Sequence, residues 1–147
     1  MIALSDTALE MGPLLDAVAD PEHGGTATFI GTTRREGGAR AVVALHYEAY
    51  EELALAEMRA IADEARVRFG AHVAVTHRVG RVEVGEPSVA VAASAAHRPA
   101  AFAACRFVID ELKARTPIWK QTLFSDGETT WIDGCAVVGR HANAAGA

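Results

Sequence analysis

The sequence predicts an α+β sandwich in which two long helices pack on a mostly antiparallel sheet. Two segments carry apolar residues at the three-and-four spacing of an amphipathic helix, and the apolar segments between them have the length and alternation of strands. No internal repeat and no linker divides the 147 residues. We therefore expect one domain over 1–138, followed by a small, polar, disordered tail over 139–147.

The N-terminal part begins with a short strand over 2–4 and a short helix over 12–18, in which a proline stands in the first turn. Two strand-like segments, 26–33 and 41–47, come next. The loop between them, 34–40, contains glycines and is typical of a hairpin connection. The two strands are therefore expected to pair with each other.

The longest helix is predicted over 51–69, where residues such as Leu55 repeat at helical spacing, and Gly70 ends it. An alternating strand follows over 72–79. The glycine at 80 and the Gly-Glu-Pro sequence at 85–87 then indicate turns before the next apolar segment.

An apolar strand is predicted over 89–94, and a second long helix over 99–114 begins at its proline. Phe102 is placed on the buried stripe of this helix by its spacing from later apolar residues. The segments 118–124 and 129–132 flank the turn residues Ser-Asp-Gly and predict a final hairpin. The predicted order of elements alternates helices with pairs of strands.

Composition excludes several classes of protein. With 50% hydrophobic and 22% charged residues the chain is not disordered throughout, and a net charge of −5 argues against a nucleic-acid-coating protein. No apolar run approaches the ~20 residues of a membrane span, and the N-terminus has no signal-peptide pattern. A cytoplasmic protein without membrane or nucleic-acid partners is expected.

Neither a metal site nor a catalytic thiol is expected. The two cysteines, Cys105 and Cys135, form no C-x-x-C pair; the first lies on an apolar helix stripe and the second has no activating base near it. Among the scattered histidines, His72 and His77 lack the spacing of metal ligands on a strand or helix.

The two lysines are the first candidates for chemistry. Twelve of the 14 basic residues are arginine, and the only lysines are Lys113 and Lys120. They lie seven residues apart across a Thr-Pro break, so Lys120 can fold back beside Lys113. The alternative is that Lys113 offsets the helix C-terminal dipole and Lys120 is an exposed strand residue.

Further basic residues suit an anionic substrate. The segment 95–122 carries a net charge of +3 in an acidic chain. Arg98, with His97 before it, lies at a helix N-terminus and predicts a phosphate site, unless Arg98 is merely solvated and His97 only caps the helix. Lys113 is over ~20 Å away along the same helix, so another loop or a second subunit must bring the two together. A further basic site lies in the loop 34–40, whose arginines either close over an anion or form a solvated hairpin tip.

Three segments resemble motifs of a known family. FIGTTR at 29–34 resembles its F-x-G-x-x-R element, and LKARTPIWK at 112–120 its L-K-x-R-x-P-x-W-K element. SAAHR at 94–98 resembles its S-x-H-R element with one additional residue. From about 24 to 131, the chain resembles the large, catalytic subunit of molybdopterin synthase, the MoaE family.

The resemblance implies an α/β hammerhead fold with an added β-hairpin subdomain. Members of the family are sulfurtransferases of molybdenum cofactor biosynthesis, which install two sulfurs on cyclic pyranopterin monophosphate to form the molybdopterin dithiolene. The sulfur arrives as a thiocarboxylate on the C-terminal Gly-Gly of a small ubiquitin-like carrier subunit, and no cofactor of the large subunit is implied. Two large subunits form a homodimer with a carrier at each end, a heterotetramer.

The resemblance also implies roles for individual positions. Arg34, His97 and Arg98 would hold the pterin and its phosphate. Lys113 would lie at the carrier's C-terminus and Lys120 beside the substrate, as the catalytic pair. The pocket would further be lined by Thr32, Thr33, Gln121 and Thr122.

The chain departs from the family at two points. Thr32 stands where some relatives have a lysine, and 133–135 offers no arginine where some relatives supply one across the dimer. Arg140, further along, is a weak substitute. Two other functions therefore remain open: a non-catalytic module that docks a ubiquitin-like tail, and a protein that binds small anions but no carrier.

Overall fold

The computed structural model describes residues 1–36 and 40–132. It confirms the α+β class, with three helices and eight strands among the described residues. In chain order the elements are β1 Ile2–Ser5, α1 Met11–Val18, β2 Gly25–Thr32, β3 Val42–Ala49, α2 Glu51–Phe69, β4 His72–Arg78, β5 Gly80–Glu83, β6 Pro87–Ala95, α3 Arg98–Arg115, β7 Ile118–Phe124 and β8 Thr129–Ile132. The expected domain end at 138, the tail 139–147, Cys135 and Arg140 lie outside the described residues.

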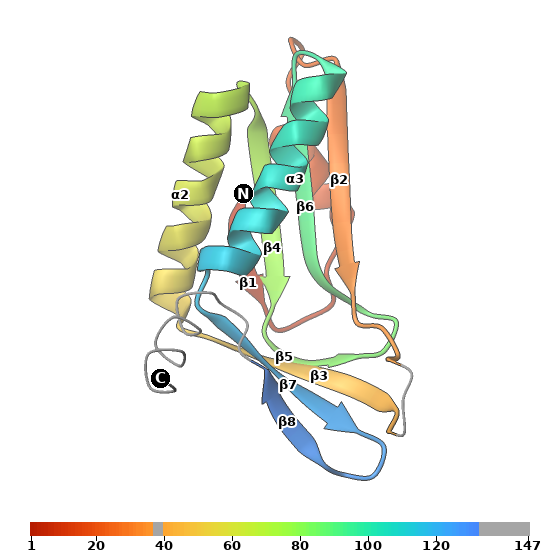
Figure 1. Ribbon diagram of the computed structural model, residues 1–147. Coiled ribbons are helices and arrows are strands. Elements are labelled where there is room, and N and C mark those ends of the chain that lie inside the picture. Colours follow the sequence, from red (N-terminus) through yellow and green to blue (C-terminus); the bar gives the residue numbers. More distant parts are fainter. Residues whose placement is uncertain (37–39, 133–147) are drawn as a thin grey trace, which may run out of the picture.

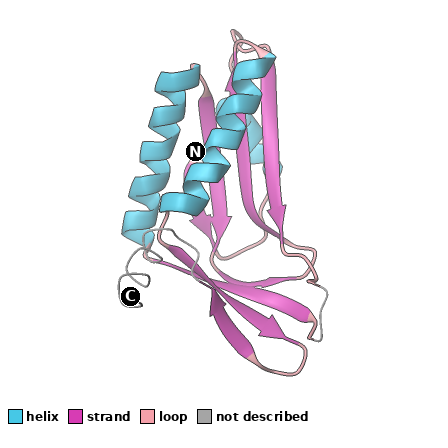
Figure 2. Cartoon of the chain, in the orientation of Figure 1, coloured by secondary structure: helices cyan, strands magenta, loops and turns pink. Residues whose placement is uncertain are grey.

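The first sheet has the strand order β1-β4-β6-β2 and is antiparallel except for the β1–β4 pair. Figure 1 shows α2 and α3 side by side on one face of this sheet. The short helix α1 covers the opposite face (Figure 2). Because β6 is covered on both faces, its sequence is a nearly continuous apolar run in which Ser88–Ala95 are all buried.

Two apolar clusters hold these layers together. The larger lies between α2, α3 and the sheet and contains Met58, Ile61, Val91 and Val108, all fully buried. The smaller joins α1, through Leu14 and its neighbours, to the other face of β4 and β6. Burying such side chains contributes on the order of 2 kcal/mol each, so these clusters fix the platform on which the site is built.

The second sheet, with order β5-β3-β7-β8, corrects one sequence prediction. β2 and β3 do not form a hairpin: β2 pairs with β6 in the first sheet, and β3 pairs with β5 and β7 in the second. The segment between β2 and β3 therefore connects two sheets. The predicted hairpin of β7 and β8 is confirmed, whereas β5, between two glycine turns, was not predicted.

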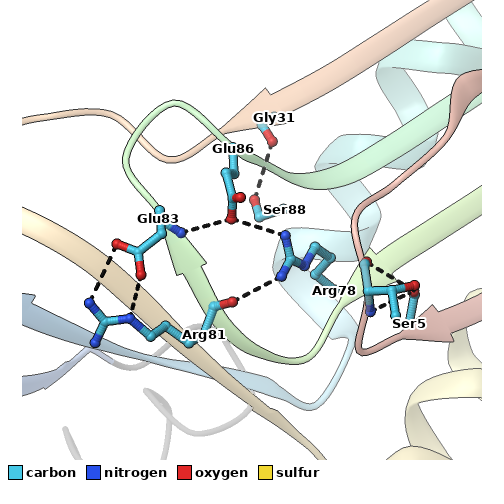
Figure 3. Close-up of polar contacts among 8 residues, drawn as sticks. Ser5, Gly31, Arg78, Arg81, Glu83, Glu86 and Ser88 are labelled. Atoms are coloured by element: carbon cyan, nitrogen blue, oxygen red, sulfur yellow. Dashed lines mark hydrogen bonds and ion pairs between the residues drawn. The ribbon is translucent and has the colours of Figure 1, made fainter.

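A polar network fixes the corner where β4 of the first sheet leads into β5 of the second (Figure 3). The buried Arg78 donates from Nη1 to Glu86 Oε2 at 3.1 Å and from Nη2 to the carbonyl oxygen of Arg81 at 3.0 Å. The same Glu86 oxygen accepts the backbone N–H of Glu83 at 3.0 Å. In Figure 3, Ser88 also donates to the carbonyl of Gly31, which ties β6 to β2 beside this corner.

None of the helices among residues 1–36 and 40–132 combines the length and the apolar character needed to cross a membrane.

Candidate active site

A cavity of about 480 Å³ lies where the end of the first sheet meets the second sheet and the C-terminal part of α3. Apolar side chains from both sheets and from α3 form much of its wall: Val42, Leu45, Val89, Ile109, Leu112, Ile118 and Ile132. Polar and charged side chains from six different segments complete it. A largely apolar pocket with a few converging polar groups is the usual form of a small-molecule site.

Both lysines of the chain, Lys113 and Lys120, line this cavity. Lys113 lies in the last turn of α3, and Lys120 lies in β7 after the break at Thr116, where the helix ends. Among the described residues, no carboxylate lies within ion-pairing distance of either ammonium group. Both positive charges are therefore free to meet a bound anion, and the break after α3 brings Lys120 to the same cavity as Lys113.

The pairing of β7 with β3 and β8 fixes the position of Lys120 in the cavity wall. It stands opposite Tyr47 of β3 and opposite Ile132 of β8. Thr122, two residues further along β7, stands opposite Leu45, and all five of these side chains line the cavity. Because alternate residues of a strand share a face, this part of the wall follows from the register of three strands.

The same alternation takes Gln121 away from the cavity. Gln121 lies between Lys120 and Thr122 on β7, pairs with His46 and Trp131, and does not line the cavity. The structure therefore does not bring Gln121 together with the other pocket residues named by the sequence.

Two buried hydroxyl groups in the cavity wall have no hydrogen-bond partner among the described residues. They belong to Thr33 and Thr116, whose side chains are each 2% exposed. The backbone of Thr33 is fixed by bonds with the β5–β6 turn, donating to the carbonyl oxygen of Glu86 at 2.9 Å and accepting from Gly85 at 2.7 Å. An unsatisfied buried hydroxyl is costly, but both oxygens are enclosed within the wall and are not themselves open to the cavity.

The FIGTTR segment supplies one rim of the cavity. Thr32 and Arg34 are exposed and line it, together with the buried Thr33. The guanidinium of Arg34 lies 3.1 Å from the carboxylate of Glu36, which also lines the cavity. This pair is highly exposed and therefore weak, so an anionic ligand can compete with Glu36 for Arg34.

His77 and Tyr47 are cavity residues that the sequence analysis did not identify. The surroundings of His77 together lower its pKa to about 4: burial is the largest cause, a hydrogen bond to the carbonyl of Arg78 opposes it, and the nearby positive charge of Lys113 adds to the lowering. Nδ1–H donates that bond at 2.7 Å. His77 is therefore a neutral imidazole whose Nε2 carries the free lone pair.

Tyr47 packs edge-on against His77, with ring centroids 5.0 Å apart. Burial raises the pKa of Tyr47, and its hydrogen bond with Ser88 opposes this shift. The sequence analysis treats Tyr47 only as part of a strand, and His77 as a strand residue without the spacing of a metal ligand. Strand alternation assigns Tyr47 and His77 each to one face of its strand. The sequence does not show which of those faces lies toward α3, because that depends on the sheet topology.

His97 and Arg98 lie at the opposite end of the molecule from the cavity. His97 is the N-cap residue of α3 and Arg98 its first residue, whereas Lys113 lies near the C-terminal end of that helix. Fifteen residues of helix separate Arg98 from Lys113 by about 22 Å. Both N-terminal residues are exposed and neither lines the cavity, so within one chain they do not join the lysines.

Cys105 is a core residue, in agreement with the sequence analysis. It is 6% exposed within the larger apolar cluster, and burial raises the pKa of its thiol to about 11. The thiolate that nucleophilic chemistry requires is therefore disfavoured at this position.

Comparisons with known proteins agree with this architecture. The model of the MoaE protein family matches residues 4–115. The molybdopterin synthase catalytic subunit of Oryza sativa subsp. indica is 50% identical over 121 residues, which cover 82% of this chain and 63% of the rice protein. The chain thus spans less than two thirds of that relative.

Solved structures show the same arrangement of elements. The molybdopterin biosynthesis MoaE protein from Burkholderia ambifaria MC40-6 is 33% identical with a TM-score of 0.76, and the match covers 96% of this chain and 97% of that one. A complex of subunits 1 and 2 of molybdopterin-converting factor from Helicobacter pylori 26695 shows a similar fold at 22% identity, with a TM-score of 0.75 and 90% coverage of each chain.

The two-sheet α+β fold and the lysine-lined cavity define a protein with a pocket for an anionic ligand. The match of the family model to most of the chain then makes the assignment specific: the chain belongs to the MoaE family. Lys113 lies within the matched residues, and Lys120 lies just beyond them.

Proposed function

We propose that this chain is the catalytic subunit of a molybdopterin synthase. It transfers sulfur from the C-terminal thiocarboxylate of a small carrier subunit to cyclic pyranopterin monophosphate, forming the molybdopterin dithiolene. The observation that carries the proposal is the position of both lysines of the chain in one cavity, with no carboxylate paired to either among the described residues. The family match supports the substrate and reaction class.

In this proposal Lys113 and Lys120 have different roles. Lys113, exposed at the end of α3, meets the thiocarboxylate of the incoming carrier tail and stabilises negative charge there or moves a proton. Lys120, deeper between β3 and β8, lies beside the pterin and stabilises its ring-opening intermediate.

The proposed partner is a small ubiquitin-like protein that ends in Gly-Gly. The related Helicobacter pylori structure is a complex of two subunits, which supports a second subunit here. A glycine tail has no side chains and can therefore enter a narrow cavity. Since the dithiolene holds two sulfurs and each carrier terminus brings one, two carriers are consumed for each product.

We also propose a homodimer, because one chain cannot bring Arg98 to the cavity. β2 is an edge strand of the first sheet, and its Phe29 and Ile30 are 37% and 48% exposed. Phe102, one turn after Arg98 on α3, is 64% exposed, which corrects the prediction that it lies on the buried stripe. A second copy covering this apolar surface accounts for its exposure and supplies a route for Arg98 of one subunit toward the cavity of the other.

The test is product formation from purified thiocarboxylated carrier and pterin precursor. Lys113→Ala is expected to lower the rate of dithiolene formation by at least about a hundredfold, the usual scale for a positioned acid, base or charge. Arg106→Ala is the matched control, because Arg106 is an exposed cation on the same helix, outside the cavity. Undiminished product formation by Lys113→Ala would remove Lys113 from the mechanism.

The same experiment separates the alternative functions. A non-catalytic docking module binds the carrier but forms no product, even with both lysines intact. A small-anion-binding protein takes up phosphate and shows no association with the carrier. Carrier binding measured by native mass spectrometry, alongside product formation, distinguishes the three.

A further inference from the structure

Three potential metal ligands meet at the end of the first sheet that lies away from the cavity. Asp20 and His23 belong to the connection between α1 and β2, and His72 begins β4. One ligand atom from each lies within 4.8 Å of the others. His77, which lines the cavity, is five residues further along β4, or about 17 Å away, so this cluster is separate from the proposed active site.

Hydrogen bonds to neighbouring groups orient His23 as a metal ligand. The buried hydroxyl of Ser94 donates its proton to the carbonyl oxygen of Val18, so its oxygen accepts a bond from Nδ1–H of His23 at 2.7 Å. In a neutral ring, this bond leaves the lone pair on Nε2. Metal-binding histidines in proteins are oriented in the same way, by a hydrogen bond from the other ring nitrogen.

Asp20 is oriented in a comparable manner. Its Oδ1 accepts the backbone N–H of Glu22 at 2.8 Å, which leaves Oδ2 facing Nδ1 of His72 at 3.7 Å. The backbone turn from Asp20 to His23, closed by a 3.1 Å hydrogen bond, brings these two side chains together. The rings of His23 and His72 lie 4.6 Å apart between centroids.

The loop that carries the ligands is packed tightly against the sheet. Gly24 donates to the carbonyl oxygen of Ala96 at 3.1 Å, and a Cβ at this glycine would come within 2.9 Å of that same oxygen. Ser94 of β6 stands directly opposite His72 in the strand register. The histidine on the loop and the histidine on the strand are therefore held on either side of one anchoring serine.

We propose that Asp20, His23 and His72 bind a divalent transition metal ion of the Zn²⁺ class. Two imidazole nitrogens and one carboxylate oxygen are ligands that Zn²⁺ and Co²⁺ accept, with water in the remaining position. Ligand atoms around such an ion lie about 3.3 Å apart, so the side chains need only small rotations to close on it. His72, 45% exposed, gives the ion access from solvent. The bound ion links the α1–β2 connection to β4.

The experiment titrates the full-length, tag-free protein, first stripped with EDTA, with Co²⁺ followed by visible absorption and with Zn²⁺ followed by calorimetry. One ion for each chain is expected. His23→Gln and His72→Gln are each expected to weaken binding at least about tenfold. His46→Gln is the matched control and is expected to keep full affinity, because His46 also lies near a single carboxylate, Glu48 at 3.7 Å, but belongs to no three-ligand cluster within residues 1–36 and 40–132.

A second measurement checks that the bound ion acts on the folded state. Zn²⁺ is expected to raise the thermal unfolding midpoint of the unsubstituted protein and of His46→Gln, and to raise that of His72→Gln less at the same Zn²⁺ concentration. Since His72 is exposed, its replacement does not endanger folding. Stoichiometric binding that survives in both His23→Gln and His72→Gln, or no saturable binding in the unsubstituted protein, overturns the proposal.

Discussion

At the scale of single residues, the cavity combines groups that are charged with one that is kept neutral. Lys113 and Lys120 are cations without carboxylate partners among the described residues, whereas burial and the charge of Lys113 keep His77 unprotonated. The lysines were found from the sequence because they are rare in this chain. His77 was missed because its protonation depends on its surroundings, which only the packed structure defines.

His77 makes the stability of the protein depend on pH. The pKa of His77 is lowered from its ordinary value of 6.5 to about 4 in the folded state, so between these values the unfolded chain binds more protons. The stabilisation is complete above about pH 6.5 and is lost as the pH falls toward 4. Urea unfolding is expected to show a loss of about 2 kcal/mol between pH 7.5 and pH 5 that is missing in His77→Gln.

The half-buried His46 supplies the control for this experiment. The loss of stability on acidification in His46→Gln should match that of the unsubstituted protein, because His46 lies on the surface of the second sheet and does not line the cavity. If acidification destabilised His77→Gln as strongly as the unsubstituted protein, the titrating group would be a different one.

At the scale of elements, the sequence predicts all three helices and seven of the eight strands found in the described part of the chain, with boundaries close to those of the structure. The one wrong pairing, β2 with β3, arose because a glycine-containing loop is compatible both with a hairpin and with a connection between two sheets. Which of these forms depends on the partners that β6 and β7 offer. Such long-range pairing is not encoded in the loop itself.

Ion pairs connect the two long helices next to the cavity. The Arg115 guanidinium at the end of α3 contacts the carboxylates of Glu57 and Glu64 of α2 at 3.2 and 2.8 Å, and that of Glu111 at 3.3 Å. This arginine belongs to the LKARTPIWK segment, two residues after Lys113. It therefore acts as a support for the lysine rather than as a ligand of the substrate, since it does not line the cavity.

Arg115→Ala is expected to destabilise the protein by about 1–2 kcal/mol, because three partly buried carboxylates are left facing one another. The measurement is urea unfolding at low and high salt, and the loss should shrink in high salt as repulsion is screened. Arg106→Ala, which removes a highly exposed pair with Asp110, should change stability by less than about 0.5 kcal/mol. Equal effects of the two substitutions would contradict a special role for Arg115.

At the scale of the whole molecule, the two basic motifs of the sequence lie at opposite ends of α3. The sequence correctly indicated that one helix cannot bring Arg98 to Lys113, and the structure shows Arg98 exposed outside the cavity. It could not place the apolar surface around Phe102, because helical spacing identifies a stripe but not whether the chain itself covers it. The same limit applies to Asp20 and His72, which lie far apart in sequence and meet only in the fold.

Mixed dimers test the proposed exchange of residues between subunits. Arg98→Ala and Lys113→Ala proteins, each inactive alone, are unfolded together, refolded and assayed as a mixture. If Arg98 serves the partner's cavity, each mixed dimer contains one intact site, and random pairing restores about a quarter of the unsubstituted activity. If both residues serve the same chain, no activity returns.

The apolar surface provides the control for this complementation. Adding Phe102→Glu to both chains should produce monomers by light scattering and abolish the recovered activity, because a charge replaces an apolar contact. Val67→Glu changes an equally exposed apolar residue on α2, 78% exposed, and should leave the recovery intact. Recovery that persisted in Phe102→Glu monomers would rule out a shared site.

The walls of the cavity come from residues scattered between Gly31 and Ile132. The layer formed by α2, α3 and the first sheet is complete once the chain has reached Arg115, but Lys120 and its neighbours follow only in the last two described strands. During synthesis, the residues of the larger apolar cluster are therefore all present before the wall of the cavity is complete. A chain that ended at Arg115 would keep that cluster but would lack Lys120 and the part of the cavity wall that β7 and β8 supply.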